Sequence, residues 1–227
     1  KCLQITYQEL ENAFEEGVGF DGSSILGFTR IEESDMIAFP DPTTFQILWW
    51  QGRERPVARV FCDIRKPDGK PYEGDPRYVL RRLLKKISDQ GYTFNVGPEL
   101  EFFLFESAHS PKTLDDGGFF DAPPLDQGVQ VRYEIIDALQ EMGIQVEFSQ
   151  IDLRDGEAMY MADVAMTYKV VAKEIAQRNN CFASFMPKPL FGVNGSGMHV
   201  HQSLFKDGRN AFYNKDDQYH LSDLAKC

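Results

Sequence analysis

The stretch Phe182-Ala-Ser-Phe-Met-Pro-Lys-Pro-Leu-Phe-Gly-Val-Asn-Gly-Ser-Gly-Met-His-Val-His-Gln-Ser-Leu-Phe205 decides the fold class of this 227-residue chain. It predicts two strands, Phe182–Met186 and Gly197–Phe205, with only a loop between them. Successive strands of a parallel sheet need a long crossover, usually a helix, between them. The two strands therefore favour an α+β fold with a mainly antiparallel sheet that is flanked by helices.

The sequence before this stretch alternates helical and extended segments. Apolar residues recur at helical spacing in three segments, which predict helices at Val79–Ile87, Val131–Met142 and Met161–Ala176. Extended apolar runs predict strands at Asn95–Phe105 and Ile144–Phe148. All of these elements follow a polar, turn-rich connector at Lys66–Pro71, which predicts a domain boundary.

The residues before this connector predict a smaller domain of short strands around one helix. The helix is expected at Gln8–Glu16 and is closed by Gly17. Strands are expected at Leu3–Tyr7, Thr44–Trp50 and Val57–Ile64. The sequence therefore predicts two domains, residues 1–65 and residues 66–227.

The charge balance restricts the partners of the chain. It carries 24 Lys and Arg against 35 Asp and Glu, a formal net charge of −11 at pH 7. A protein that binds nucleic acid needs clustered cations to neutralise phosphates, so this surplus of carboxylates argues against such a partner. The longest apolar runs, such as Phe102–Phe105, are far shorter than a membrane span. The composition suits an enzyme that needs carboxylates and takes its cations as metal ions.

The cysteines and the first residues predict a reducing compartment. Cys2, Cys62, Cys181 and Cys227 lie far apart and form no CxxC pair, which is neither a zinc signature nor a disulfide scaffold. The chain opens without the charged and apolar regions of a signal peptide. We therefore expect a cytoplasmic protein.

Two acidic side chains lie in the most informative strand, Gly97-Pro-Glu-Leu-Glu-Phe-Phe-Leu-Phe105. The two-residue period of a strand puts Glu99 and Glu101 on one face, about 6.5–7 Å apart. Adjacent carboxylates repel each other and resist desolvation in so apolar a strand. Either this face is a solvated edge, or each carboxylate binds a divalent metal. Hard oxygen ligands favour Mg²⁺ or Mn²⁺.

A second polar face is predicted in the strand that follows Asn194-Gly-Ser-Gly197. The same period puts His199, His201 and Ser203 on one side of that strand. Two histidines on one face after a loop of small residues are a fair ligand pattern, although each is also compatible with a structural role. The loop lets a ligand approach the backbone closely, but it is neither a P-loop nor a GxGxxG fingerprint.

Two further segments have both a structural and a functional interpretation. The segment Gly19–Ile25, which carries Asp21 and Ser24, is on its own typical of a turn with a capping residue. Lys188 lies between two prolines in an extended segment. It is expected either to fix a charge near the site or to make a loop rigid.

Taken together, these stretches resemble glutamine synthetase of the bacterial and archaeal type I class. The matching segments occur in the family's order and extend over nearly the whole chain: Phe20–Ile25, Arg30–Asp35, Gly97–Leu104, Phe185–Pro189 and Asn194–His199. Any one of them is weak evidence, but their joint occurrence makes chance a poor explanation.

The resemblance implies a fold, an assembly and a reaction. The implied fold is a small β-grasp N-terminal domain followed by part of an α+β catalytic domain. The implied assembly is a double-ring homododecamer whose active sites are shared between neighbouring subunits. In the implied reaction, L-glutamate attacks the γ-phosphate of ATP to give γ-glutamyl phosphate, and ammonia then displaces phosphate to yield L-glutamine. Two or more Mg²⁺ or Mn²⁺ ions would neutralise the charge of the transferred phosphoryl group.

The resemblance also assigns site residues by their motif position. Glu99 and His199 are the implied ligands of the metal near the nucleotide phosphates, and Glu101 is an implied ligand of the second metal. Asn194 and Gly195 match the loop that binds glutamate.

Other positions match the nucleotide site and the intersubunit site of the family. His201 and Ser203 match nucleotide-binding positions, and Glu147 is a further candidate. Asp21 and Ser24 match the segment that a neighbouring subunit contributes. There, Asp21 would help to deprotonate ammonium.

The chain departs from the family pattern in two places. After Val146-Glu-Phe-Ser149 the family normally continues through a His-His-Glu stretch and a Gly-Gln-x-Glu stretch, which supply two more carboxylates to the second metal. Here Gln150 follows at once, so either a loop has been omitted or the second metal site is lost. The family also continues well beyond Cys227, so we expect a truncated chain that is inactive alone.

Two other hypotheses stay open. The chain could be a catalytically inactive relative or fragment with an assembly or regulatory role. It could also be an unrelated metal-dependent hydrolase that uses the two glutamates and the two histidines, although the sequence offers no distinct base for that reaction.

Overall fold

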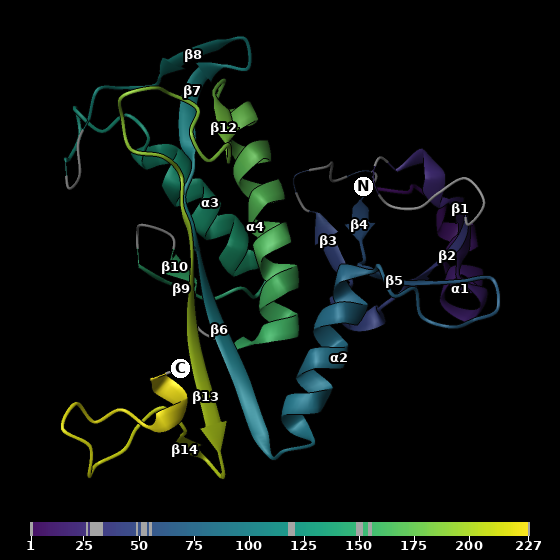
Figure 1. Cartoon of the computed structure of the whole chain (residues 1–227). Helices are drawn as coiled ribbons and strands as arrows, with labels where there is room; N and C mark the ends of the chain where they lie inside the picture. Colours follow the sequence, from purple (N-terminus) through teal and green to yellow (C-terminus); the bar gives the residue numbers. More distant parts are fainter. Residues whose placement is uncertain are drawn as a thin grey trace. The chain divides into compact units, whose positions relative to one another are not determined.

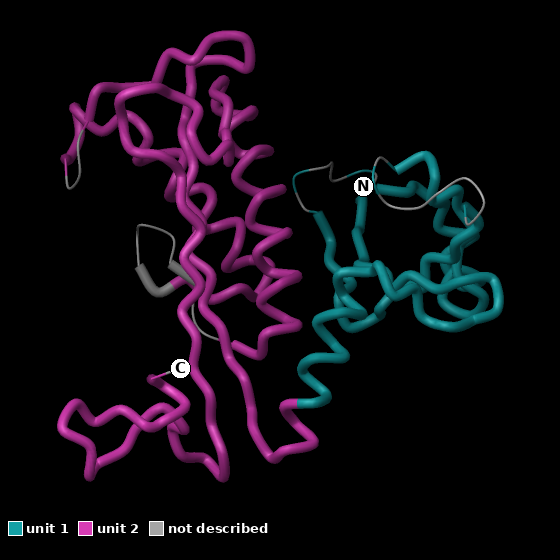
Figure 2. The backbone as a smooth tube through the Cα atoms, viewed as in Figure 1, with its two compact units in different colours: residues 1–86 teal, residues 87–227 magenta. Residues whose placement is uncertain are grey.

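The structure is a computed structural model, and it describes residues 2–25, 27, 34–48, 50, 54, 56–117, 121–148, 152–153 and 156–226. The chain divides into two compact units, residues 1–86 and residues 87–227 (Figure 2). Among the described residues, no helix combines the length and the apolar character that crossing a membrane requires.

In the first unit, one helix packs on a three-stranded antiparallel sheet. Helix α1 (Tyr7–Glu16) begins after Thr6, whose backbone N–H donates a 3.2 Å hydrogen bond to the Glu9 carboxylate in a capping box. It ends at Gly17, whose φ of 78° lies in the left-handed region that favours glycine. The sheet has the order β1-β2-β5, formed by Val18–Asp21, Asp35–Pro40 and Cys62–Arg65.

The remaining elements of this unit are short. Strands β3 (Gln46–Leu48) and β4 (Val57–Arg59) form a separate antiparallel pair. Two 3₁₀ helices, η1 (Gly22–Ser24) and η3 (Pro42–Thr44), follow aspartates that cap them.

Two strand predictions in this unit are wrong, and a third is too long. Leu3–Tyr7 is not a strand, because Thr6 caps α1 and Tyr7 already lies in that helix. Val57–Ile64 is not one strand, because β4 and β5 pair in different sheets. The predicted strand Thr44–Trp50 is reduced to β3, since Thr44 ends η3.

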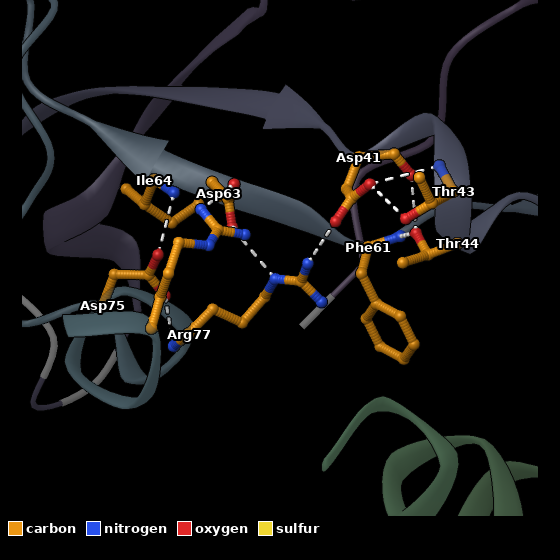
Figure 3. Close-up of polar contacts among 9 residues, drawn as sticks. Asp41, Thr43, Thr44, Phe61, Asp63, Ile64, Asp75 and Arg77 are labelled. Atoms are coloured by element: carbon orange, nitrogen blue, oxygen red, sulfur yellow. Dashed lines mark hydrogen bonds and ion pairs between the residues drawn. The ribbon is translucent and has the colours of Figure 1, made fainter. Parts of the chain in front are cut away.

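Helix α2 (Pro76–Ser88) is fixed to the first unit by ion pairs at its start (Figure 3). Arg77 lies between two carboxylates: its Nε is 3.0 Å from Asp63 and its Nη2 is 2.6 Å from Asp41. Asp75 caps the helix by accepting from the backbone N–H of Arg77 at 3.1 Å, and it also accepts from the N–H of Ile64 at 3.1 Å. These contacts join the helix to β5 and to the turn after β2.

The second unit is built around a long pair of antiparallel strands, β6 (Tyr92–Leu100) and β13 (Met198–Lys206) (Figure 1). They lie in a four-stranded sheet of order β11-β6-β13-β14, with β11 at Gly156–Glu157 and β14 at Arg209–Asn210. A three-stranded sheet of order β12-β7-β8 comprises Phe182–Ser184, Phe103–Ser107 and Ser110–Thr113. Strands β9 (Val146–Phe148) and β10 (Asp152–Leu153) form a further pair.

Helices α3 (Val129–Glu141) and α4 (Ala158–Arg178) pack against each other and form the core of this unit. The Tyr168 side chain of α4 is 1% exposed, and its hydroxyl donates to the Leu100 carbonyl of β6 at 3.3 Å. Other side chains with no exposed surface are Ile135, Ala138, Leu139, Val171, Ala172 and Ala176. All strand pairs among the described residues are antiparallel, so the predicted α+β class is confirmed.

The predicted single strand Asn95–Phe105 is wrong. It is broken after Leu100, because β6 pairs with β13 whereas β7 pairs with β12 and β8. Phe102 lies at the break, with its ring centroid 5.2 Å from that of Phe185 and 6.2 Å from that of Tyr168. The apolar core therefore holds the chain where it passes from one sheet to the other.

Candidate functional site

Strands β6 and β13 bring the predicted acidic and imidazole side chains together. The register pairs Glu99 with His199 and Gly97 with His201. Residues that lie opposite each other in such a ladder project from the same face, and so do residues two positions apart. Glu101 extends this arrangement, because its backbone N–H donates to the Gly197 carbonyl at 3.0 Å.

Each imidazole contacts a carboxylate that lies diagonally across the ladder. His201 Nε2 is 3.1 Å from Glu99 Oε2, and His199 Nε2 is 3.3 Å from Glu101 Oε1. The exposed fractions of these four side chains run from 37% for Glu99 to 68% for His201. The site thus consists of two His–Glu pairs that a small ligand can reach from solvent.

Gly197 makes room for the Glu101 carboxylate. Its backbone N–H donates to Glu101 Oε2 at 3.0 Å. A Cβ at Gly197 would lie 3.1 Å from His199 Nε2 and 3.3 Å from Glu101 Oε1, closer than side chains usually pack. Sequence reasoning treated this glycine only as part of a loop. The signal that points to it is its position directly before the strand that carries both histidines.

The donor chemistry of the two pairs suits divalent cations. Carboxylate oxygens are the ligands that Mg²⁺ and Mn²⁺ prefer in proteins, whereas imidazole nitrogens are typical ligands of transition-metal ions. Among the described residues, however, His, Cys, Asp and Glu side chains nowhere form a group of three or more that could hold a metal ion. Each His–Glu pair could therefore supply at most part of a coordination shell, and a bound metal would need further ligands to complete it.

The residues predicted to bind glutamate lie in the loop before β13. Gly195 passes so close to Pro187 that a Cβ there would overlap the Pro187 carbonyl oxygen, which explains the glycine. The next residue, Ser196, donates its backbone N–H to the same oxygen at 2.9 Å. The Ser196 hydroxyl is buried and has no hydrogen-bond partner among the described residues. The Asn194 side chain is exposed, two residues before the backbone hydrogen bond from Ser196 to Pro187.

Asp21 and Ser24 lie in the first unit, at the end of β1 and in η1. The Asp21 carboxylate accepts from the Ser23 hydroxyl at 2.6 Å, from the Ser23 N–H at 2.8 Å and from the Ser24 hydroxyl at 3.0 Å. These bonds, that of the Ser23 hydroxyl above all, lower the pKa of Asp21. Sequence reasoning missed Ser23, although Asp-Gly-Ser-Ser is a typical capping pattern.

Two other predicted nucleotide-binding residues lie elsewhere in the second unit. Ser203 lies opposite Asn95 in the β6–β13 ladder, two positions beyond His201. Glu147 lies in β9, and its side chain is outside the described part of the structure. Ser149 and Gln150, where the chain departs from the family pattern, are also outside the described residues.

Comparison with known proteins matches both the N-terminal and the C-terminal part of the chain to the same family. The family model described as "Glutamine synthetase, beta-Grasp domain" matches residues 1–67, and the one described as "Glutamine synthetase, catalytic domain" matches residues 73–227. Glutamine synthetase of Methanosarcina mazei is 52% identical over 238 residues, which cover 99% of this chain and 53% of that protein. Glutamine synthetase of Clostridium saccharobutylicum is 49% identical, with 99% of this chain and 54% of that protein covered.

Comparison with solved structures also finds glutamine synthetases. A cryo-EM structure of Plasmodium falciparum glutamine synthetase has a TM-score of 0.83 and 27% sequence identity, and the match covers 98% of this chain and 50% of that one. The chain thus spans about half the length of the proteins it matches. Since both family models match it, and the catalytic one alone covers more than half of its residues, the chain belongs to the glutamine synthetase family.

Proposed function

We propose that the protein to which this chain belongs ligates ammonia to L-glutamate, with ATP as the energy source and γ-glutamyl phosphate as the intermediate. The observation that carries this proposal is the pairing of Glu99 with His201 and of Glu101 with His199 along the β6–β13 ladder and its continuation just past the end of β6. Such side chains can hold divalent cations, and phosphoryl transfer needs cations because the negative charge on the transferred group has to be neutralised.

The four paired side chains would have different roles near the phosphates, three as metal ligands and one in contact with the nucleotide. Glu99 and His199 would hold the divalent ion nearest the nucleotide, and Glu101 would contribute to a second ion. Mg²⁺ or Mn²⁺ bound there would stabilise the negative charge of the phosphoryl group in the transition state. His201 and Ser203, together with Glu147, would contact the nucleotide.

The loop before β13 and the turn after β1 would bind the other two substrates. Asn194 and the backbone of Gly195 would orient glutamate so that its side-chain carboxylate reaches the phosphoryl group. Asp21, supported by Ser24, would bind ammonium. Because its pKa is lowered, Asp21 stays ionised and would attract the cation. It would then accept a proton from ammonium, which leaves ammonia with the lone pair it needs to attack.

The second candidate is a catalytically inactive family member with an assembly or regulatory role. The alignment with the Methanosarcina mazei protein extends over 238 residues, more than the 227 of this chain, so the relative has positions that this chain lacks. This difference fits a missing segment between Ser149 and Gln150. We favour the active enzyme, because the two His–Glu pairs are intact.

The assembly and the compartment are part of the same proposal. A double-ring homododecamer would let the Asp21 segment of one subunit complete the active site of its neighbour. A cytoplasmic location would supply ATP, glutamate and ammonia.

The test is an assay of phosphate release and glutamine formation by the full-length protein with ATP, glutamate, ammonium and saturating Mg²⁺ or Mn²⁺. We expect Glu99→Gln to lower kcat at least about 100-fold, since it removes a carboxylate ligand of the metal ion that would stabilise the transition state. Glu141→Gln, an exposed carboxylate at the end of α3, is the control and should leave kcat unchanged. Wild-type protein that forms no glutamine would refute the proposal and favour the inactive family member.

A further inference from the structure

We propose that Lys188 is a positioning residue that holds the loop Pro187–Ser196 closed and so fixes Asn194 for its ligand. The identity of that ligand as glutamate rests on the proposed function. The closure of the loop does not, because it follows from contacts inside the loop.

The two ends of the loop are pinned to each other by the backbone. The Ser196 N–H donates to the Pro187 carbonyl oxygen at 2.9 Å. The absent side chain of Gly195 lets the two backbone segments approach, since a Cβ there would overlap the same oxygen. Backbone hydrogen bonds therefore fix where the loop closes, and among the described residues none of them holds residues 188–195.

Lys188 supplies the contact that crosses the loop. Its ammonium group donates a hydrogen bond to the carbonyl oxygen of Val193, the residue directly before Asn194. The stem runs beside Gly195, because its Cδ would lie 3.6 Å from a Cβ at that position. Pro187 and Pro189 restrict the backbone on both sides of Lys188, which reduces the backbone entropy lost when this segment takes one conformation.

Apolar packing contributes little to the closed loop. The Phe191 side chain is fully exposed, and Val193 is 47% exposed. A loop whose large apolar side chains are mostly exposed depends strongly on its polar contacts to stay in one conformation. Loss of the Lys188 contact should therefore loosen the segment that carries Asn194 while the core of the second unit stays intact.

Hydrogen–deuterium exchange tests the closure without any reference to activity. In the full-length protein, Lys188→Met removes the donor but keeps an unbranched stem. We expect faster exchange in peptides that cover residues 190–196, by about three- to ten-fold if one hydrogen bond is lost, with no change in α4. Lys188→Arg keeps a donor and should restore protection. Lys215→Met removes an exposed lysine elsewhere in the unit and should have no effect on these peptides. Unchanged exchange in Lys188→Met would overturn the inference.

Steady-state kinetics then tests the link to the ligand. For Lys188→Met we expect a rise in the KM for glutamate of about three- to ten-fold, with the KM for ATP unchanged and kcat within about two-fold. A rise in the KM for ATP alone would instead assign Lys188 to the nucleotide and overturn the positioning role. Failure of the wild-type protein to make glutamine would refute the proposed function, while the exchange result would still decide whether Lys188 closes the loop.

Discussion

At the scale of single residues, the candidate site depends on small side chains as much as on ionisable ones. The two-residue period of a strand was enough to predict that Glu99 shares a face with Glu101, and His199 with His201. It could not predict which imidazole meets which carboxylate, because that depends on the register between strands far apart in sequence. The role of Gly197 could not be predicted for a related reason. It depends on the contact between the Gly197 backbone and the Glu101 carboxylate, which only the folded structure reveals.

The buried hydroxyl of Ser196 leads to a prediction about stability. Because the hydroxyl has no hydrogen-bond partner among the described residues, Ser196→Ala should leave the free energy of unfolding unchanged or raise it by less than about 1 kcal/mol. The matched control is Thr167→Val in α4, which removes the 2.8 Å bond from a buried hydroxyl to the Asp163 carbonyl and should cost about 1 kcal/mol. Urea denaturation measures both. A loss in Ser196→Ala as large as in the control would show that this hydroxyl has a partner.

At the scale of secondary structure, the long periodic elements were the predictable ones. Gly197–Phe205 was predicted within one residue of β13, and the helix predicted at Met161–Ala176 lies within α4. The predicted strand Asn95–Phe105 failed because the apolar residues continue past the break after Leu100, as the run Phe102–Phe105, so nothing in the sequence marks where the chain changes sheets. A pattern along one strand carries no information about its neighbours. Leu3–Tyr7 failed because the cap at Thr6 outweighs a short alternation.

The ion pairs between Asp63 and two arginines of α2 lead to a prediction about stability. Burial alone would raise the pKa of Asp63, but hydrogen bonds from Arg81 and Arg77 outweigh it and lower this pKa below the ordinary value of 3.8. Asp63→Asn should lower the free energy of unfolding by about 2 kcal/mol at pH 7, since it leaves the largely buried Arg77 with one carboxylate fewer. Denaturation of the full-length protein measures this change.

The pH dependence of this effect follows from linkage. A carboxyl with a lowered pKa in the folded state stabilises the protein fully above pH 3.8, and this contribution disappears as the pH falls through the lowered value. The difference between wild type and Asp63→Asn should therefore shrink below about pH 4. Asp68→Asn is the control, because its pair with Lys70 is exposed, and it should change stability far less than Asp63→Asn does. Equal losses in both variants would contradict the anchoring role of Asp63.

At the scale of the whole molecule, the sequence predicted two domains with a boundary after residue 65. The compact units divide at residue 86, because the ion pairs of Arg77 keep most of α2 with the first unit. The family models match residues 1–67 and 73–227, and residues 68–72, which include most of the predicted connector, lie outside both matches. Long-range ion pairs such as Asp41–Arg77 cannot be predicted from composition, whereas the polar connector can.

The number of metal sites is a property of the whole molecule, and it can be measured by linkage between binding and stability. A ligand present at 100 times its Kd stabilises the folded state by about 2.7 kcal/mol per site. We expect Mn²⁺ to raise the Tm of the full-length protein and Glu99→Gln to remove most of this shift. If the absence of the family's two carboxylates after Ser149 removes the second metal site, Glu101→Gln should leave the Mn²⁺-induced rise in Tm intact. A single carboxylate such as Glu101 binds a divalent ion too weakly to contribute to that rise. If the second site persists, Glu101→Gln should reduce the shift as well. A Tm that does not respond to Mn²⁺ in the wild type would contradict the assignment of Glu99 and His199 to a metal site.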